Sequence, residues 1–327
     1  MNAELPTTQP HRISVVIPFW KGDEYIVKCV TSIKSSTAKV ENLIVVDNSP
    51  TTFPWDTLHL GDIPLTIVRS RSSLGFARAV NIGILRAKEL GATRVAIINQ
   101  DSYILADTLE LLSHTLDSYR DAFVATPISL AYDSSTISEF FLQTYVRAAP
   151  RLLKDYLSGS LADAYPVEFN GTNGSCMMMD CVTLGKVGLF DPLFSMYGED
   201  WDIFRRAKHL GYQILIVPKA SHHHAHTLSS LRHSIGGSSA LNTNLALAGL
   251  LLTIKNPKIS ALRALKHVLL PILREQFQLV ASGNLRQVMQ QLFQGVTLIP
   301  TVCAALLHRN RFLLNIRITL QAQQDRK

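Results

Sequence analysis

The sequence predicts an α/β protein with a mixed, mainly parallel sheet flanked by helices, followed by a helical extension. Short apolar runs bounded by turn residues recur in the first half of the chain, and each reads as a buried strand. They are Ile13–Ile17, Leu43–Val46, Leu65–Val68 and Val95–Ile98. Helical patterns separate them, as in the stretch from Phe76 to Glu89. Alternation of strand and helix is typical of a parallel sheet covered on both faces.

Composition divides the chain of 327 residues into three parts. Residues 1–11 are polar and rich in Pro and Thr, so we expect a flexible N-terminus without a secretory signal. Residues 12–239 contain the alternating pattern, with a variable excursion over 134–168, and are predicted to form the main domain. Residues 240–327 are rich in Leu and Ala and predict helices at roughly 241–256, 259–282 and 285–308.

Charge is concentrated in the C-terminal region. Residues 231–327 hold 12 Lys and Arg against two acids, whereas residues 1–230 hold 20 Lys and Arg against 23 Asp and Glu. This asymmetry indicates an anionic partner for the C-terminal region alone. The apolar stretch Gly295–Leu307 is shorter than the roughly 20 residues that a membrane span requires.

We therefore expect amphipathic helices that lie on an anionic membrane surface. Five basic side chains are predicted to meet the lipid headgroups: Lys255, Lys258, Arg263, Lys266 and Arg274. The alternative is an ordinary helical subdomain that packs on the core. Four scattered cysteines suit a reducing compartment. We therefore predict a cytoplasmic protein that is peripheral on the inner face of the plasma membrane. We predict no nucleic-acid partner.

Polar side chains follow the predicted strands, and ligands of such sheets bind outside the carboxyl ends of the strands. The groups at these ends are Pro18, Phe19 and Trp20, then Asp47, Asn48 and Ser49, then Arg69 to Ser73, and finally Asn99, Gln100 and Asp101. Asp and Asn also open turns, so one such group alone does not establish a site. Two groups at neighbouring strand ends favour one.

Asp101 is the main candidate metal ligand. Mg²⁺ and Mn²⁺ sites typically combine one or two carboxylates with substrate phosphates. The run from Ser221 to His226 contains four histidines, and a neutral imidazole is a common metal ligand. We expect most of these histidines to lie in a solvated loop and select His224 as a ligand, with His226 in reserve.

Three acids lie close together at the start of a predicted helix, Asp200–Leu210: Glu199, Asp200 and Asp202. Acids at a helix start can simply favour the helix dipole and cap the first turn. That explanation does not account for three of them beside aromatic residues. The functional interpretation is a positioned carboxylate that takes a proton from an attacking hydroxyl.

Five segments, in order along residues 12–232, resemble family 2 of the glycosyltransferases, and especially its bacterial rhamnosyltransferase-like branch. They are Ile13–Pro18, Ile44–Ser49, Leu74–Ala77 with Asn81–Gly83, Asn99–Asp101, and Gly188–Asp191 leading to Tyr197–Asp202. The resemblance implies a GT-A catalytic domain over residues 12–239. It also implies a donor that is a nucleoside diphosphate sugar, and Mg²⁺ or Mn²⁺ as the cofactor.

The resemblance also implies roles for individual residues. Asp200 would be the catalytic base, beside Glu199, and Asp101 with His224 would hold the metal on the diphosphate. Gly174 and Trp201 would face the acceptor. The nucleotide-sugar would be bound by Pro18, Phe19, Asp47, Asn48, Arg69, Gly75, Asn81, Asn99 and Gln100. The metal triplet begins with Asn99 where the family has an aspartate. Metal attachment within the triplet could therefore rest on Asp101 alone, with His224 and the diphosphate oxygens supplying more of the ligands.

The function implied is inverting transfer of a sugar, with deoxythymidine diphosphate rhamnose as a candidate donor, to a hydroxyl of a glycan or lipid-linked oligosaccharide in cell-surface polysaccharide synthesis. Nucleotidyl transfer is an alternative, although Phe19–Gly22 makes a poor phosphate cradle. Metal-dependent hydrolysis by the histidine run is another. A non-catalytic membrane-binding module would leave the ordered carboxylates without a role.

Overall fold

The structure is a computed structural model of the chain. It describes residues 11–21, 23–51, 53–58, 60–70, 73–145, 148–168, 172, 174–225, 239–281 and 299–309. The predicted flexible N-terminus lies outside these residues except for His11, whose ring is 2.8 Å from a carboxylate oxygen of Asp117. His226 and most of the predicted helix 285–308 also lie outside them.

The described strands form one nine-stranded sheet in the order β3-β2-β1-β4-β8-β6-β9-β5, with β7 paired to β9. The first four are parallel and correspond to the predicted apolar runs. They are β1 (Ile13–Phe19), β2 (Val40–Asp47), β3 (Leu65–Arg69) and β4 (Arg94–Ile98). Antiparallel pairs begin at β8 (Cys176–Asp180), which joins β4 to β6 (Ala122–Ala131). The sheet is therefore mixed, as predicted.

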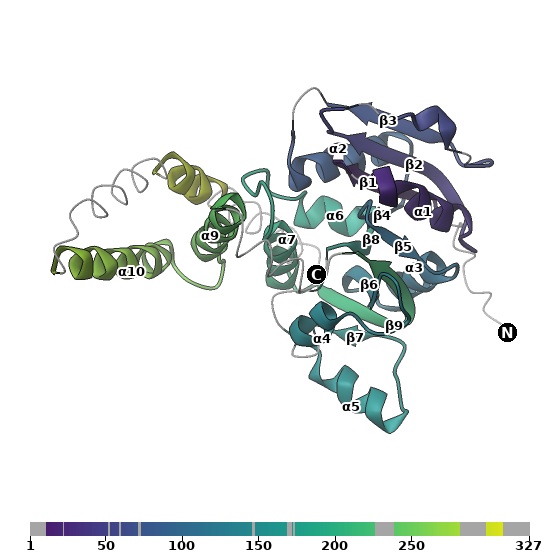
Figure 1. The fold of residues 1–327 in the computed structure, drawn as a ribbon. Coiled ribbons are helices and arrows are strands. Elements are labelled where there is room, and N and C mark those ends of the chain that lie inside the picture. Colours follow the sequence, from purple (N-terminus) through teal and green to yellow (C-terminus); the bar gives the residue numbers. More distant parts are fainter. Residues whose placement is uncertain are drawn as a thin grey trace, which may run out of the picture.

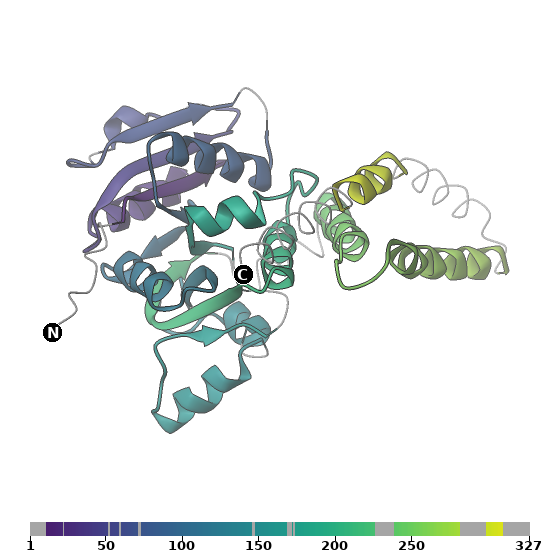
Figure 2. The same cartoon turned by 180° about the vertical axis from the view of Figure 1, so that it is seen from behind.

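Helices cover both faces of the sheet, giving three layers (Figures 1 and 2). On one face lie α1 (Asp23–Lys34) and α3 (Thr108–Ser118). On the other lie α2 (Phe76–Glu89), α6 (Cys181–Val187) and α7 (Glu199–His209). Alternate residues of β1 join different cores: Val15 and Ile17 face the first layer and Val16 the second, because successive strand side chains point to opposite faces. A short 3₁₀ turn, Trp55–Thr57, follows β2.

The histidine run belongs to a strand, which corrects the expectation of a solvated loop. The predicted strand Gln213–Val217 continues as β9 (Gln213–His224), past Pro218. Its far end pairs with β5 (Ser102–Ile104), so that His224 lies opposite Ser102. A register shift relative to β6 accommodates the proline, since proline cannot donate a ladder hydrogen bond. Pairing on both sides buries His222 and His223.

The predicted excursion over 134–168 contains regular structure. It holds α4 (Glu139–Tyr145), α5 (Pro150–Ser158) and the short strand β7 (Tyr165–Pro166), which pairs with β9. Phe141 and Leu152 join the core on the face of α2, so this excursion packs on the sheet.

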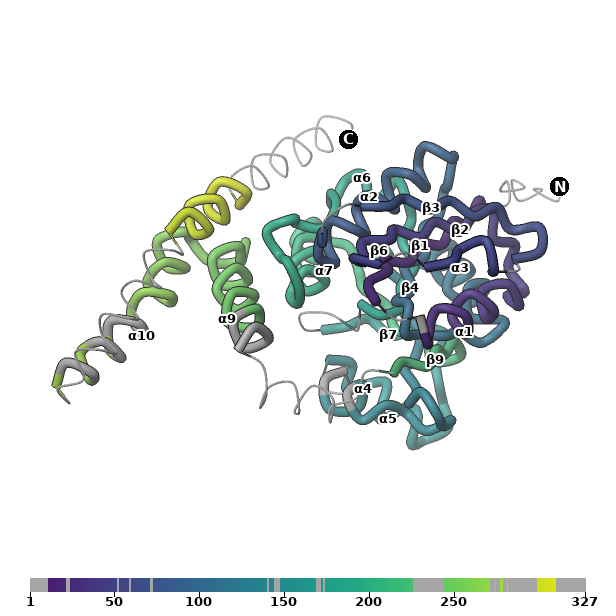
Figure 3. Tube along the Cα trace, turned by 45° about the horizontal axis from the view of Figure 1, so that its top comes forward, coloured from purple at the N-terminus to yellow at the C-terminus, as the bar shows by residue number. Residues whose placement is uncertain are grey.

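Two described C-terminal helices and a helical segment over 299–309 follow the sheet domain, near the predicted positions. They are α9 (Ser239–Ile254) and α10 (Ala261–Ala281). Figures 1 and 3 show α9 beside α7, while α10 points away from the sheet. Within the described residues, no helix is both long and apolar enough to cross a lipid bilayer.

Lys255 does not face outward as the sequence pattern suggested. It is 6% exposed, and its ammonium lies 2.6 Å from a carboxylate oxygen of Asp191. The expectation of a lipid contact is therefore wrong for this residue, because a buried ion pair with the sheet domain occupies it. Lys258, Arg263, Lys266 and Arg274 are exposed, as the pattern predicted.

Candidate active site

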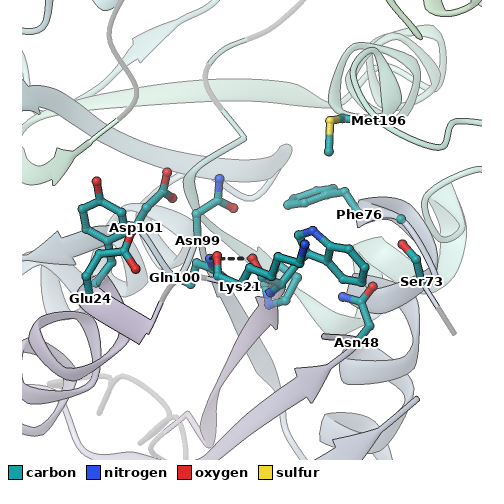
Figure 4. A pocket seen from close by; sticks show the side chains of 13 residues that line it. Lys21, Glu24, Asn48, Ser73, Phe76, Asn99, Gln100, Asp101 and Met196 are labelled. Atoms are coloured by element: carbon teal, nitrogen blue, oxygen red, sulfur yellow. Dashed lines mark hydrogen bonds between the residues drawn. The ribbon is translucent and has the colours of Figure 1, made fainter. Parts of the chain in front are cut away.

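A cavity of about 440 Å³ opens at the carboxyl ends of β1, β2 and β4 (Figure 4). This is the place where parallel sheets bind ligands. Six predicted site residues line it: Pro18, Asn48, Gly75, Asn99, Gln100 and Asp101. Seven lining residues were not predicted: Trp20, Lys21, Glu24, Tyr25, Ser73, Phe76 and Met196. The strand-end rule covers Trp20 and Ser73, which follow the first and third strands, although neither was selected as a site residue, and Lys21 comes directly after Trp20. Met196 reaches the cavity only through tertiary packing.

Gln100 shapes the loop after β1. Its side-chain amide donates to the carbonyl oxygens of Trp20 and Lys21, at 3.0 Å each, and its amide oxygen accepts from the Trp20 backbone N–H at 2.6 Å. The backbone N–H of Lys21 donates to Ser49 Oγ at 2.9 Å. Lys21 has a φ of 43°, which non-glycine residues rarely adopt and which these contacts hold in place. Gln100 thus positions two cavity residues.

Asp47 is fully buried and accepts three hydrogen bonds. The donors are the Ser49 backbone N–H, the Trp55 indole N–H and the Arg69 guanidinium, at 3.0, 3.1 and 2.9 Å. Asp47, Arg69 and Phe19 are not among the described lining residues of the cavity. Phe19 instead packs edge-on against Trp55, with ring centroids 4.9 Å apart. These three side chains therefore act indirectly, by packing and hydrogen bonding next to the segments that line the cavity.

Asn48 and Asn81 have different surroundings. Asn48 lines the cavity, and its amide bridges the chain by donating to the Phe19 carbonyl and accepting from the Leu74 N–H. Asn81, on α2, exchanges two hydrogen bonds with the backbone of Phe190, at 2.8 and 3.0 Å. Its amide is therefore used to attach the Phe190 segment to α2, and we do not place it against the donor.

Gly75 lies where another loop crosses α2. It has a φ of 71°, and a Cβ at this position would lie 2.4 Å from the carbonyl oxygen of Ser195. The next residue, Phe76, donates its backbone N–H to that oxygen at 3.2 Å. A side chain at Gly75 would separate the two segments, so glycine is required for this approach.

Asp101 and His224 lie together, from different strands. His224 Nε2 is 3.4 Å from Asp101 Oδ1, and both side chains are largely buried. The other described histidines of the run are engaged elsewhere: His222 with Ser175 Oγ at 2.8 Å, and His223 with the Ala131 carbonyl at 2.7 Å. Burial lowers the pKa of His222 to about 3, so it is neutral.

A carboxylate suits Mn²⁺, and a neutral imidazole is a common metal ligand. The buried Oδ1 of Asn99 has no hydrogen-bond partner in the described part of the chain, and it lines the same cavity. Among the described residues, no group of three or more His, Cys, Asp or Glu side chains is arranged to hold a metal. The residues present therefore fit an ion that takes further ligands from a bound diphosphate.

Glu199 and Asp200 begin α7, after two residues with positive φ, Tyr197 at 69° and Gly198 at 86°. Burial and the neighbouring Asp200 raise the pKa of Glu199 to about 8. Burial also raises the pKa of Asp200, to about 6, but backbone N–H donors, among them Trp201 at 2.8 Å, stabilise its ionised form. Glu199 Oε2 has no such partner among the described residues. Of the two carboxyls, Glu199 is therefore the harder to ionise and Asp200 the easier.

A short chain of contacts joins Asp200 to the end of β4. A Cβ added to Gly174 would lie 3.2 Å from Asp200 Oδ2, so Gly174 lies directly against that carboxylate. The next residue, Ser175, accepts the backbone N–H of Asn99 at 2.8 Å. Trp201 is half-buried beside Asp200. Asp200 and Asp101 therefore approach the same end of the sheet, although the described lining of the cavity includes only Asp101.

Residues 14–161, somewhat under half of the chain, match the sequence model of the family described as "Glycosyl transferase family 2". The chain is 27% identical over 135 residues to "Glycosyltransferase GlyG" of Streptococcus pneumoniae serotype 4, which covers 40% of this chain and 44% of that protein. The family resemblance expected from the motifs is confirmed over this segment. Neither match bears on the rhamnosyltransferase-like branch.

Solved structures share the fold at low sequence identity. Residues 1–349 of TarS from S. aureus superpose with a TM-score of 0.54 at 13% identity, covering 77% of this chain and 68% of that one. GalNAc-T7, crystallised with UDP, GalNAc and Mn²⁺, superposes with a TM-score of 0.52 at 16% identity, covering 67% of this chain and 45% of that one. The chain thus spans less than half the length of GlyG and of GalNAc-T7. The predicted GT-A fold is confirmed.

Proposed function

We propose, from the premise that residues 14–161 belong to glycosyl transferase family 2, that this chain is an inverting glycosyltransferase. It moves a sugar from a nucleoside diphosphate donor to an acceptor hydroxyl. The observation that carries the proposal is the meeting of two features at one end of the sheet. One is the cavity that Asp101 lines, and the other is the ionised Asp200, which Gly174 and Ser175 connect to Asn99.

Asp200 is the proposed base. Its buried carboxylate receives backbone N–H donors and is ionised above a pKa of about 6, so it can take a proton near neutral pH. The acceptor oxygen would lose its proton to Asp200 as it forms a bond to the anomeric carbon. The bond from that carbon to the diphosphate breaks in the same step, and the diphosphate leaves with both electrons. Attack opposite the leaving group inverts the anomeric configuration.

The donor is proposed to occupy the cavity between Asn48 and Asp101. Trp20 is 39% exposed at the cavity and offers an aromatic face to a base, while Asn48 and Ser73 offer polar groups. Asp101 and His224 would hold Mg²⁺ or Mn²⁺, which when bound neutralises charge on the leaving diphosphate as a Lewis acid. We propose deoxythymidine diphosphate rhamnose as the first donor to test, on the motif resemblance to the rhamnosyltransferase-like branch.

The acceptor is proposed to be a glycan or lipid-linked oligosaccharide of cell-surface polysaccharide synthesis, reached at the inner face of a membrane. Support comes from α10, where Leu262, Leu269 and Phe277 are exposed at intervals of about two helical turns. Lys266 and Arg274 are exposed on the same helix. Apolar and basic side chains together suit a helix that lies in an anionic lipid interface.

A thermal-shift screen of UDP, GDP and deoxythymidine diphosphate with Mn²⁺ tests the donor and the metal together. A ligand at 100 times its Kd stabilises the folded state by about 2.7 kcal/mol, or about 4 °C for a chain of 327 residues. We expect one diphosphate to raise Tm and Mn²⁺ to increase that rise. Asp101→Ala should remove the increase due to Mn²⁺.

Asp107→Ala is the matched control, because Asp107 is exposed and its side chain makes no capping hydrogen bond. It should respond as the unmodified chain does. A Tm that no diphosphate changes would contradict the proposed donor site. A Mn²⁺ response that survives in Asp101→Ala would remove Asp101 from the metal role.

A further inference from the structure

A lysine from the C-terminal region lies between two acids of the segment that carries Glu199 and Asp200. Lys255 Nζ lies 2.6 Å from Asp191 Oδ2 and 3.7 Å from Asp202 Oδ1. All three side chains are less than 9% exposed. Asp191 begins the loop that leads to α7, and Asp202 lies in the first turn of that helix. We call this arrangement the Lys255 clamp, meaning Lys255, Asp191 and Asp202.

The segment between the two acids is held in an unfavourable backbone conformation. Tyr197 and Gly198 both have positive φ, and Tyr197 has a Cβ that disfavours it. Such a conformation persists only where the surroundings enforce it. Contacts at both ends of the segment supply that enforcement. Glu199 and Asp200 follow the corner directly, so their direction depends on it.

Packing from α9 closes on the same corner. A Cβ on Gly198 would lie 3.1 Å from Phe194 Cε1, 3.2 Å from Ala248 Cβ and 3.3 Å from Leu252 Cδ1. Phe194 forms a small core with Leu251, Ile254 and Ala305, which come from the C-terminal helices. The loop therefore lies between α9 on one side and Gly75 and Phe76 of α2 on the other, where its Met196 reaches the donor cavity.

Further charged groups complete the cluster and leave its acids compensated. Arg206 Nε donates to Asp202 Oδ2 at 2.9 Å, and its other nitrogens donate to the Val187 and Leu189 carbonyls. His308 Nδ1 lies 3.1 Å from both oxygens of Asp191. Arg206 holds Asp202 within its own helix, and His308 contacts Asp191 alone. Of these partners, only Lys255 contacts both acids.

We infer that Lys255 is a positioning residue, which joins Asp191 to Asp202 and so holds the Tyr197–Gly198 corner that aims the catalytic pair. This role rests on the proposed function, but its structural part does not. The clamp also makes the C-terminal helices a structural part of the active site, because Lys255 directly follows the last residue of α9. Removing the ammonium should allow the Tyr197–Gly198 corner to change conformation while the sheet stays folded.

Hydrogen exchange tests the structural part without any substrate. In the full chain, Lys255→Met should speed amide exchange over residues 192–204 by about tenfold or more, while strands β1 to β4 keep their protection, because local openings can occur without global unfolding. Lys258→Met is the matched control, since Lys258 is exposed three residues further on and carries the same charge. It should leave exchange unchanged.

Turnover tests the catalytic part. For Lys255→Met we expect kcat to fall about 10- to 100-fold with donor KM changed less than about twofold, since a misplacement of 1 Å can cost a hundredfold. Lys255→Arg should recover part of the loss. If Lys255→Met fails to fold, Lys255→Met/Asp191→Asn removes an uncompensated charge and should restore Tm but not kcat.

The outcomes separate the two ideas. Wild-type exchange over 192–204 in Lys255→Met, or in the double variant, would overturn the clamp. So would a kcat that recovers together with Tm in the double variant, because the lysine would then serve stability alone. Faster local exchange in a chain that transfers no sugar from any nucleoside diphosphate would keep the structural clamp and reject the proposed function.

Discussion

Two C-terminal helices of similar Leu-rich character lie in opposite environments. At the end of α9, Leu251 and Ile254 are fully buried, and Lys255 pairs with acids of the sheet domain. On α10, by contrast, Leu262 is 67% exposed and Phe277 is 76% exposed. One helix packs against the loop that precedes α7, and the other leaves large apolar side chains exposed.

The two helices have the same kind of composition, so composition does not determine which helix is buried and which is exposed. A basic residue within an apolar pattern can be an outward contact or a buried ion pair, and only its neighbours decide which. We therefore expect changes around α7 and α9 to affect turnover, and changes on α10 to affect membrane binding. The following predictions test that separation.

The largest effect is expected at the helix that α9 supports. Asp200→Asn should lower kcat by more than about a hundredfold, because general-base help typically contributes about 10²–10⁴-fold. Donor-induced changes in Tm should persist, since an asparagine oxygen can still accept the Trp201 N–H. Steady-state kinetics measure the first effect and thermal shift the second. Near-normal turnover would exclude Asp200 as the base.

A smaller effect is expected on α10. Lys266→Gln/Arg274→Gln should weaken binding to vesicles of phosphatidylcholine and phosphatidylglycerol by about 2 kcal/mol, or about 30-fold, at about 1 kcal/mol for each basic residue near the surface. Turnover in solution should not change. Sedimentation with vesicles measures the binding.

Lys154→Gln/Lys186→Gln is the control for charge alone, because both lysines are exposed on the sheet domain, on α5 and α6. It should bind vesicles as the unmodified chain does. If both double variants lost binding equally, attraction would follow net charge and α10 would have no special part in it.

The smallest effect concerns pH. The pKa of Asp200 is raised to about 6, mainly by burial, so the base form disappears as pH falls through that value. We expect kcat/KM to be level above about pH 7 and to fall roughly tenfold from that level by pH 5. The same carboxyl should favour stability most below its unfolded pKa, and this contribution is lost as pH rises through about 6. A flat rate profile from pH 5 to 8 would contradict the assignment.

Local sequence patterns were sufficient for strands β1 to β4 and for the position of the cavity. The apolar runs that became β1, β2 and β4 are largely buried, so their composition alone distinguishes them, whereas the run that became the edge strand β3 is half-buried. Because parallel strands place their carboxyl ends at one edge of the sheet, Asn48 and Asp101 were expected in the same site, and both line the cavity.

Other outcomes depended on partners that are distant in the sequence. Asp47 and Asn81 lie in motifs that predict nucleotide-sugar binding. Their polar atoms nevertheless form hydrogen bonds with the Arg69 guanidinium and with the Phe190 backbone. The described histidines of the run form the end of β9 because this segment pairs with β5 on one side and with β6 on the other. No local sequence pattern around these residues predicts such a partner.

What the sequence by itself determined is the alternation of the first four strands with helices, the family match over residues 14–161 and the acids at the strand end and helix start. These follow from periodicity and short motifs, which act over a few residues. What only the tertiary structure decided is which polar groups face the cavity, which acid is ionised, and that Lys255 is buried against Asp191 and Asp202. Burial and ion pairing depend on residues that folding brings together from far apart in the chain, and these set the charge and direction of each group.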